Sequence, residues 1–280
     1  MSENPQANTP EETLSNHAVA NLAPASGDVT DDVELPSGLS GCIRRWKLSD
    51  LRFLTNRQTL SRPGPVVDST ILKATWIETH SVGPYAFTGH PPWMAEVLAG
   101  DTTEAVRRGR MITWGDEYPV DFRCESRRCG ARIPYDAKLS DMEVIPMSEE
   151  ALAGYVNDNR FTWTFPECGK RLVYGLPTGK TQVLASKLVK QNGPIDEAVW
   201  ASRTHSIEGA SPSQFVKFYG DLSPVDVMAL EKELERHDCG VRTKVDLVCP
   251  DFSCGLEQVQ ELRFASNFYR PQDGARDLLG

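Results

Sequence analysis

The chain has 280 residues, of which 40% are hydrophobic and 25% are charged, a globular composition with room for one large domain or two small ones. Its mean hydropathy of −0.39 is too polar for a protein embedded in a bilayer. The net charge is −9, but the first forty residues hold seven acids and no Lys or Arg, so the rest of the chain is nearly neutral at −2. That balance argues against a protein held on nucleic acid mainly by neutralising phosphates.

The N-terminal third divides into an arm and a first folded region. Residues 1–32 are expected to form a disordered acidic arm, because their Asn, Pro, Ala, Thr, Glu and Ser side chains bury too little apolar surface to offset the entropy of ordering. Residues 33–118 are predicted to be mainly helical, with a short strand at 42–46. An apolar run at 71–77 fits either a helix or a strand.

The helices of this region are predicted from their first residues. A Ser-Asp pair can cap the first, a double proline can open the second, and Asp101 or Thr102 can cap the third. These helices are expected near residues 49–54, 91–100 and 101–115.

The rest of the chain is predicted to alternate between strands and helices. Residues 119–140 and 241–272 should form an antiparallel β core, and residues 141–240 should form an insertion between its halves. The insertion has a hairpin near 161–174, a helix capped by Thr178, a shorter helix at 213–219, and a helix that Ser223 and Pro224 start. Residues 273–280 are left as a C-terminal tail. The predicted fold class is therefore α+β.

The most specific signal is a motif that occurs twice. Each copy reads strand, cysteine, four residues, cysteine, glycine, strand, from Phe122 to Ala131 and again from Leu247 to Leu256. A hairpin tip with two thiolates supplies half of a tetrahedral site, and the glycine permits the turn that aims backbone amides at sulfur. The motif predicts a zinc ribbon with a structural Zn²⁺, whose ligands are Cys124, Cys129, Cys249 and Cys254.

Other interpretations of the cysteines stay open. The usual spacing in such motifs is two residues rather than four, buried free cysteines are common, and four thiolates also suit iron. The odd total of seven cysteines, with no secretion-signal pattern at the start, indicates a reduced intracellular chain rather than a disulfide framework. Packing is the expected role of the three without partners at ligand spacing, Cys42, Cys168 and Cys239.

Catalytic signals are weak, so we expect the protein not to be an enzyme. The segment from Gly175 to Thr181 resembles a phosphate-binding loop but is one residue short between its glycines, and a helix-initiating turn is the preferred interpretation. No histidine pair has metal-ligand spacing. Four arginines around the first motif suggest a nucleic-acid face, or else they offset the thiolate charge or pair with acids near the second motif: Arg123, Arg127, Arg128 and Arg132.

The order of features resembles that of the T-even-type bacteriophage baseplate-hub assembly proteins of contractile tails and related injection systems. The resemblance lies in Leu35 to Gly38, in Trp46 to Asn56, in a run from Leu98 to Cys124, in the second cysteine pair, and in Phe264 to Pro271. It covers residues 33–272 as a series of weak signatures, and not every family member keeps the cysteines.

The resemblance implies a non-enzymatic structural or assembly component. It would link the central hub or spike to the tape-measure protein and tail tube, in the virion tail baseplate or in the host cytoplasm during assembly. No small-molecule substrate and no membrane are expected, and nucleic acid is not the favoured partner. The alternatives are a zinc-ribbon nucleic-acid-binding protein and, more weakly, a nucleotide-using enzyme at Gly179-Lys180-Thr181.

Overall fold

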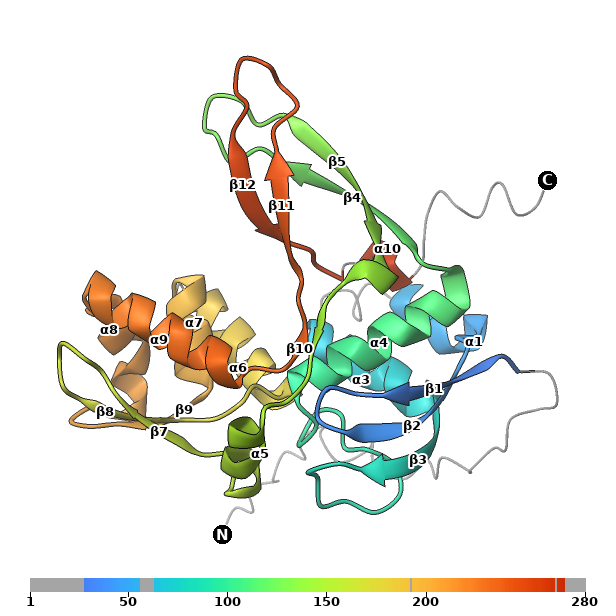
Figure 1. Cartoon of the computed structure of the whole chain (residues 1–280), viewed down its shortest axis with the longest axis horizontal. Coiled ribbons are helices and arrows are strands. Elements are labelled where there is room, and N and C mark those ends of the chain that lie inside the picture. The colour runs from blue at the N-terminus through green and yellow to red at the C-terminus, as the bar shows by residue number, and fades with distance from the viewer. Residues whose placement is uncertain (1–27, 56–62, 192, 265, 270–280) are drawn as a thin grey trace, which may run out of the picture.

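The computed structural model describes residues 28–55, 63–191, 193–264 and 266–269. It is an α+β arrangement in which two parts made of helices and small antiparallel sheets lie side by side, and a pair of long hairpins projects from them (Figure 1). Among the described residues, no helix is long and apolar enough to cross a membrane.

The N-terminal part is built on a three-stranded antiparallel sheet. Its strands are β1 (Thr30–Glu34), β2 (Leu39–Arg44) and β3 (Trp76–Val82), in the order β1-β2-β3. Within β2, Gly41 is required, because a Cβ atom there would lie 2.3 Å from the Trp76 ring and 2.2 Å from the Glu78 carbonyl oxygen. The helices of this part are α1 (Leu48–Leu51), η1 (Arg52–Thr55), α3 (Gly64–Thr75) and α4 (Ala99–Trp114).

The region combines these helices with the three-stranded sheet, and the sequence did not indicate strand β1. Strand β1 already begins at Thr30, inside the predicted arm, because it pairs with β2 along five residues; residues 1–27 lie outside the described part. The ambiguous run 71–77 splits between α3 and β3.

The predicted helix at 91–100 is absent. Residues up to Leu98 form turns, and α4 starts at Ala99. Leu98 is held in an extended conformation by a bridge to Thr178 and by its amide, which donates to the Tyr85 hydroxyl at 3.1 Å. These tertiary contacts override the local helix signal.

The middle part contains the predicted hairpin, β7 (Phe161–Thr164) and β8 (Arg171–Tyr174), extended by β9 (Thr204–Ile207), which the sequence did not indicate. Ser223 caps its longest helix as predicted, accepting from the Asp226 amide. The helices are α5 (Glu149–Val156), α6 (Gly179–Lys190), α7 (Ile195–Ser202), η3 (Pro212–Gln214), α8 (Phe215–Gly220) and α9 (Pro224–His237).

The two ends of the middle part meet each other and helix α4. Strands β6 (Val144–Ile145) and β10 (Gly240–Val241) pair antiparallel. Gly100 of α4 lies directly against this pair, since a Cβ atom on it would come within 2.1 Å of the Cys239 carbonyl oxygen. Only backbone fits between α4 and β10, so the insertion is anchored to the N-terminal part by close packing.

The cysteine motifs lie on the projecting hairpins, which form two separate two-stranded sheets. The first is β4 (Glu117–Arg123) with β5 (Arg132–Lys138), and the second is β11 (Lys244–Val248) with β12 (Glu257–Glu261). A 3₁₀ turn, η2 (Leu139–Asp141), follows the first, and α10 (Ser266–Tyr269) follows the second.

The hairpins bury side chains on one face only. Phe122, Ile133 and Leu247 on that face belong to the same apolar cluster that runs through the N-terminal and middle parts and through the base of the hairpins. There Tyr118 packs edge-on against Phe268 of α10 with ring centroids 5.1 Å apart. We call the two projecting hairpins (117–138 and 244–261) the lobe, and the N-terminal and middle parts together the body. The lobe is attached to the body at one end and free at the other (Figure 1).

Candidate metal centre

Each cysteine pair sits at a hairpin tip, and the two tips have the same backbone hydrogen bonds. The first cysteine donates across the hairpin, from Cys124 N to Ala131 O and from Cys249 N to Leu256 O, both at 2.9 Å. The second cysteine and the glycine after it donate to one carbonyl, that of Ser126 or Asp251. The glycines have φ of 60° and 55°, a left-handed conformation that favours glycine. The repeated motif therefore folds into the same turn twice.

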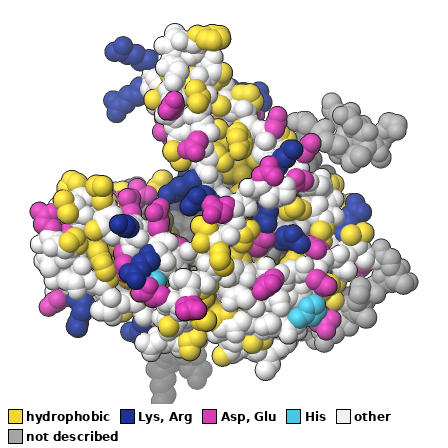
Figure 2. Space-filling model, viewed as in Figure 1, with side chains coloured by type: hydrophobic (Ala, Val, Ile, Leu, Met, Phe, Trp, Pro, Cys, Tyr) yellow, Lys and Arg dark blue, Asp and Glu magenta, His cyan; other side chains and the backbone are white. Residues whose placement is uncertain are grey.

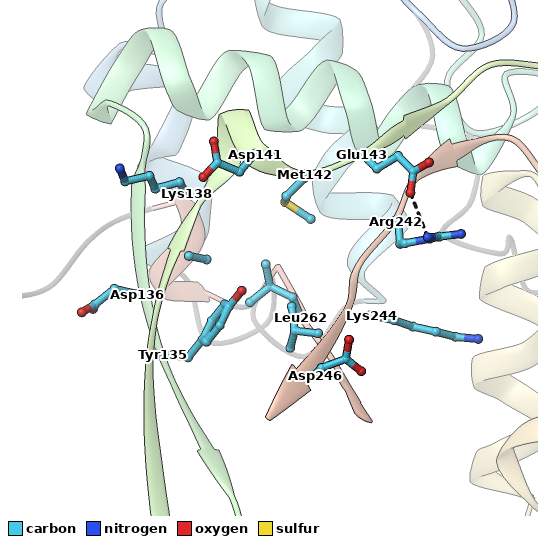
Figure 3. A pocket seen from close by; sticks show the side chains of 12 residues that line it. Tyr135, Asp136, Lys138, Asp141, Met142, Glu143, Arg242, Lys244, Asp246 and Leu262 are labelled. Atoms are coloured by element: carbon cyan, nitrogen blue, oxygen red, sulfur yellow. Dashed lines mark ion pairs between the residues drawn. The ribbon is translucent and has the colours of Figure 1, made fainter. Parts of the chain in front are cut away.

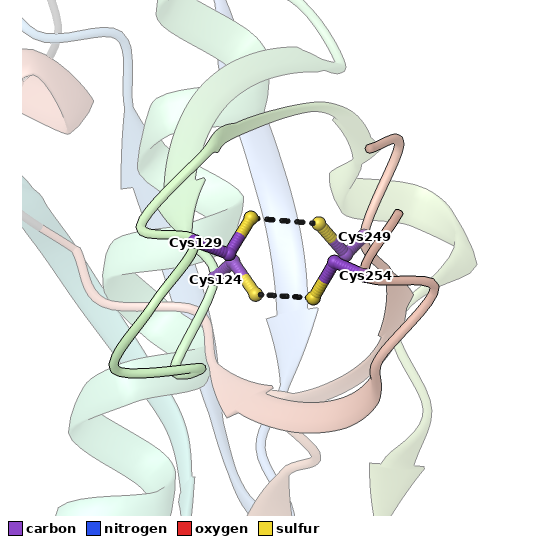
Figure 4. A group of neighbouring side chains, drawn as sticks. All are labelled: Cys124, Cys129, Cys249 and Cys254. Carbon is purple, nitrogen blue, oxygen red and sulfur yellow. Dashed lines mark hydrogen bonds between the residues drawn. The ribbon is translucent and has the colours of Figure 1, made fainter. Parts of the chain in front are cut away.

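The equivalence extends down the strands with a constant offset of 125 residues. Arg123 pairs with Arg132 in the first hairpin as Val248 pairs with Glu257 in the second. Across the lobe the first cysteine of each tip faces the second cysteine of the other (Figure 4). That crossed pairing is the contact pattern of two units related by a two-fold axis.

The four sulfur atoms form a compact cluster. Cys124 Sγ lies 3.6 Å from Cys254 Sγ, and Cys129 Sγ lies 3.6 Å from Cys249 Sγ, while all four lie within 4.8 Å of one another. Four thiolates at about 2.3 Å from one Zn²⁺ in a tetrahedron would be about 3.8 Å apart. The separations are far too long for disulfides, which need about 2.05 Å. The donor set and its size fit one tetrahedral metal ion.

The surroundings of the sulfurs favour thiolates at some positions only. The Leu256 amide and neighbouring thiols donate to Cys254 Sγ and lower the pKa of that thiol. The Asp251 amide also donates to Cys249 Sγ, but desolvation and the other three sulfurs raise the pKa of Cys249 to about 12. Four negative charges so close together repel one another, and a divalent cation is the simplest group that would allow all four to ionise.

Polar contacts tie the two hairpins together just below the sulfurs. The Gln258 and Gln260 side-chain amides donate to the Arg123 carbonyl oxygen at 3.2 and 2.6 Å, and the Glu125 amide donates to Gln258 Oε1 at 3.0 Å. Phe122 and Leu247 are buried on the facing sides of the two sheets. The sequence offered no signal for the role of the glutamines, because glutamine in a strand is usually solvated.

Open grooves flank the rest of the lobe. One of about 600 Å³ separates β5 from β11 (Figure 3), and another of about 670 Å³ separates β4 from β12. Tyr135 and Leu262 face the first groove, and Glu143 and Arg242 pair across its rim at 2.9 Å. Neither strand pair forms a backbone ladder across these gaps, so side-chain contacts and the cysteine tips connect the hairpins.

The four arginines do not behave as one group. Arg132 pairs with Asp121 in its own hairpin, so the predicted pairing with acids near the second motif does not occur. The other three are exposed, and the described residues offer none of them a carboxylate within 4.0 Å: Arg123, Arg127 and Arg128. On the second tip Phe252 is fully exposed, at 108% of its reference area. The sequence pattern did not indicate this residue.

The remaining cysteines lie away from the cluster. Cys239 packs against the core, and burial raises the pKa of its thiol, while Cys42 is half-buried in β2. The packing role predicted for Cys168 was wrong, because it is exposed in the β7–β8 turn, where its amide donates to buried Asp226. A turn between short strands exposes its middle residues whatever their hydrophobicity.

The segment from Gly175 to Thr181, which resembles a phosphate-binding loop, leads into helix α6, as its preferred interpretation predicted. Thr178 and Thr181 cap each other at the start of α6, and the Lys180 amide donates to the Met94 carbonyl oxygen at 3.0 Å. Two of the amides that would surround a phosphate, those of Thr178 and Lys180, are therefore already bonded. Among the histidines, His237 is buried, and its Nδ1 atom lies 2.9 Å from the Tyr174 hydroxyl oxygen. His17 lies outside the described residues.

Comparisons of the chain with protein-family models, with curated proteins and with solved structures found no match. The class of the site therefore follows from its own geometry: four cysteines from two equivalent hairpin tips that could hold one metal ion.

Proposed function

We propose that the protein is a non-enzymatic structural or assembly component in which Cys124, Cys129, Cys249 and Cys254 hold one structural Zn²⁺. The observation that carries this is the meeting of two equivalent tips with all four sulfurs within 4.8 Å. Four thiolates complete a tetrahedral shell and leave no open position for a substrate or an activated water. Such an ion stabilises structure rather than performing chemistry.

The metal would close a very long loop. Cys129 and Cys249 are separated by the whole middle part, whose ends already meet at β6 and β10. Grooves open on both sides of the lobe, and the two hairpins form separate sheets. A structural zinc contributes on the order of 10 kcal/mol in small domains, enough to fix one hairpin against the other.

Metal analysis tests this proposal directly. Protein purified without a metal-affinity tag should contain one equivalent of zinc by mass spectrometry, and little iron. Less than about half an equivalent of zinc after purification and zinc supplementation would contradict it. An equivalent of iron instead, with the visible absorption of ferric thiolate, would keep the site but overturn the metal.

The biological setting we propose is the hub of a phage-type baseplate, linking the hub or spike to the tape-measure protein and tail tube. Its support is the ordered resemblance over residues 33–272 together with a scaffold-like metal site. Co-expression with the tail tube, spike and tape-measure proteins of a contractile-tailed phage should yield a complex on a density gradient, if the genes that flank its own encode such proteins. Sedimentation of the chain alone in every combination would count against this setting.

A second candidate is a zinc-ribbon protein that binds nucleic acid, favoured by exposed arginines of the first tip that have no carboxylate partner among the described residues. It predicts salt-sensitive binding to DNA or RNA that is lost when Arg127 and Arg128 are both changed to Ala. If the protein passes unretained through a DNA or RNA column at 50 mM salt, this candidate fails.

A further inference from the structure

The two tips have the same backbone but opposite surface chemistry. Applying the offset of 125 residues, Arg127 of the first tip corresponds to Phe252 of the second, and Arg123 corresponds to Val248. The first tip is thus cationic where the second is apolar. Figure 2 shows basic and hydrophobic side chains together at the free end of the lobe.

The exposed hydrophobic side chains of the second hairpin include more than Phe252. Phe252 is fully exposed at the tip, and behind it three more hydrophobic side chains are exposed along the second hairpin: Val248 (61%), Leu256 (37%) and Val259 (58%). Val248 and Val259 are diagonal neighbours on the outer face of that hairpin, since Val259 pairs with Asp246, which lies two residues before Val248 on the same face. Contiguous exposed apolar groups of this kind mark interaction sites.

The exposed arginines of the first tip have no acidic partner in the described chain, since Arg127 and Arg128 have no carboxylate within 4.0 Å among the described residues. Aromatic side chains and arginines are the residue types enriched in the binding hot spots of protein interfaces. The position fits that role, because a tip held by a metal loses little conformational freedom on docking.

The charge around the tip favours a protein over a nucleic acid. Residues 123–132 carry four arginines and one glutamate, and residues 248–257 carry two acids. Together with the −2 charge of a zinc tetrathiolate, these leave the tip close to neutral. Nucleic-acid affinity grows with the number of phosphates neutralised, whereas a protein partner needs only local complementarity.

We infer that the metal-bound tip is a protein-docking surface, whose partner presents an apolar socket for Phe252 and carboxylates for Arg127 and Arg128. Phe252 and the two arginines contribute differently to binding. Burial of Phe252 provides most of the affinity, and the arginines set orientation and the rate of encounter. The inference rests on the proposed metal site for the rigidity of the tip, and it names a partner chemistry which that site alone does not specify.

The test uses the full-length, metal-loaded protein and a displayed library of random 16-residue peptides. Selection on the wild type, with counter-selection on the bare support, should enrich peptides that combine Leu, Ile, Met or Phe with Asp or Glu. Phe252→Ser should weaken the enriched peptides at least about tenfold. Arg127→Glu with Arg128→Glu should weaken them most at low salt.

Matched controls lie on the body. Met228→Ser alters an exposed apolar side chain of α9, and Lys187→Glu with Lys190→Glu reverses an exposed basic pair of α6. Neither should change peptide binding. Zinc content is measured for every variant, so a lost metal site is distinguished from a lost docking surface.

Four results would overturn the inference. One is a zinc-loaded protein that enriches no peptide of this composition, and another is peptide binding that Phe252→Ser leaves unchanged. A third is tight binding of mixed-sequence DNA or RNA at 50 mM salt that the double arginine variant abolishes, which would assign the tip to nucleic acid. The last is self-association in sedimentation velocity that Phe252→Ser removes, which would make a second copy the partner.

Discussion

Replacing Cys249 by Ser tests whether the sulfur cluster is a metal site. Cys249 is buried, with 4% of its surface exposed, and its sulfur lies 3.6 Å from that of Cys129. If about 10 kcal/mol of metal-binding free energy is shared among four thiolates, one ligand contributes about 2.5 kcal/mol. Since 1.4 kcal/mol is a factor of ten, the affinity for zinc should fall by nearly two orders of magnitude.

The loss should appear first in the projecting lobe. Its backbone ladders are confined to the separate hairpins. In Cys249→Ser, or in wild type with a chelator, amides of 117–138 and 244–261 should therefore exchange faster with deuterium while those of α4 stay protected. Exchange measured by mass spectrometry and a competitive chelator titration provide the two readouts. Cys168→Ser is the matched control, because Cys168 is exposed and outside the cluster.

Two outcomes would refute the reasoning. One is a Cys249→Ser protein whose zinc affinity and lobe protection equal those of Cys168→Ser. The other is chelation that melts the whole molecule in one transition, which would mean that the metal supports the body as well as the lobe.

Three further changes probe the body. Gly41→Ala should destabilise the fold by at least about 1–3 kcal/mol in urea unfolding, because its Cβ would overlap the Trp76 ring; an unchanged midpoint would show that β2 and β3 can separate. Asp226→Ala should lower the free energy of unfolding by about 2–4 kcal/mol, because the buried carboxylate accepts from two amides of the β7–β8 turn. Asp226→Asn keeps one acceptor and should lower it less. Equal losses in the two variants would contradict this. Burial raises the pKa of Asp68 to about 7, although the Tyr269 hydroxyl donates to its carboxylate. Between about pH 4 and pH 7 the folded state therefore binds more protons than the unfolded state. In this range Asp68 makes the free energy of unfolding fall as the pH rises. Asp68→Asn should flatten that part of the pH–stability curve, and an unchanged slope would rule out the group as its source.

Local signals in the sequence were enough for the hairpin tips and for several helix starts. The cysteine-glycine turns, the β7–β8 hairpin and the caps of α6 and α9 depend on interactions within a few residues, and each forms where it was predicted. The strands β1 and β9 were missed because they gain their partners from segments that the local pattern does not contain. The expected helix at 91–100 failed for the same reason, since Leu98 bonds to distant residues.

By itself, the sequence determined which four cysteines could be ligands, because strand, cysteine spacing and glycine are all encoded within ten residues. Only the tertiary structure decided that the two tips meet, that Cys124 faces Cys254 while Cys129 faces Cys249, and that the lobe projects from the body (Figure 1). Those outcomes depend on how the middle part brings together segments more than one hundred residues apart, which no local pattern encodes. The structure also distinguished the tips by exposing Phe252 on one and arginines on the other.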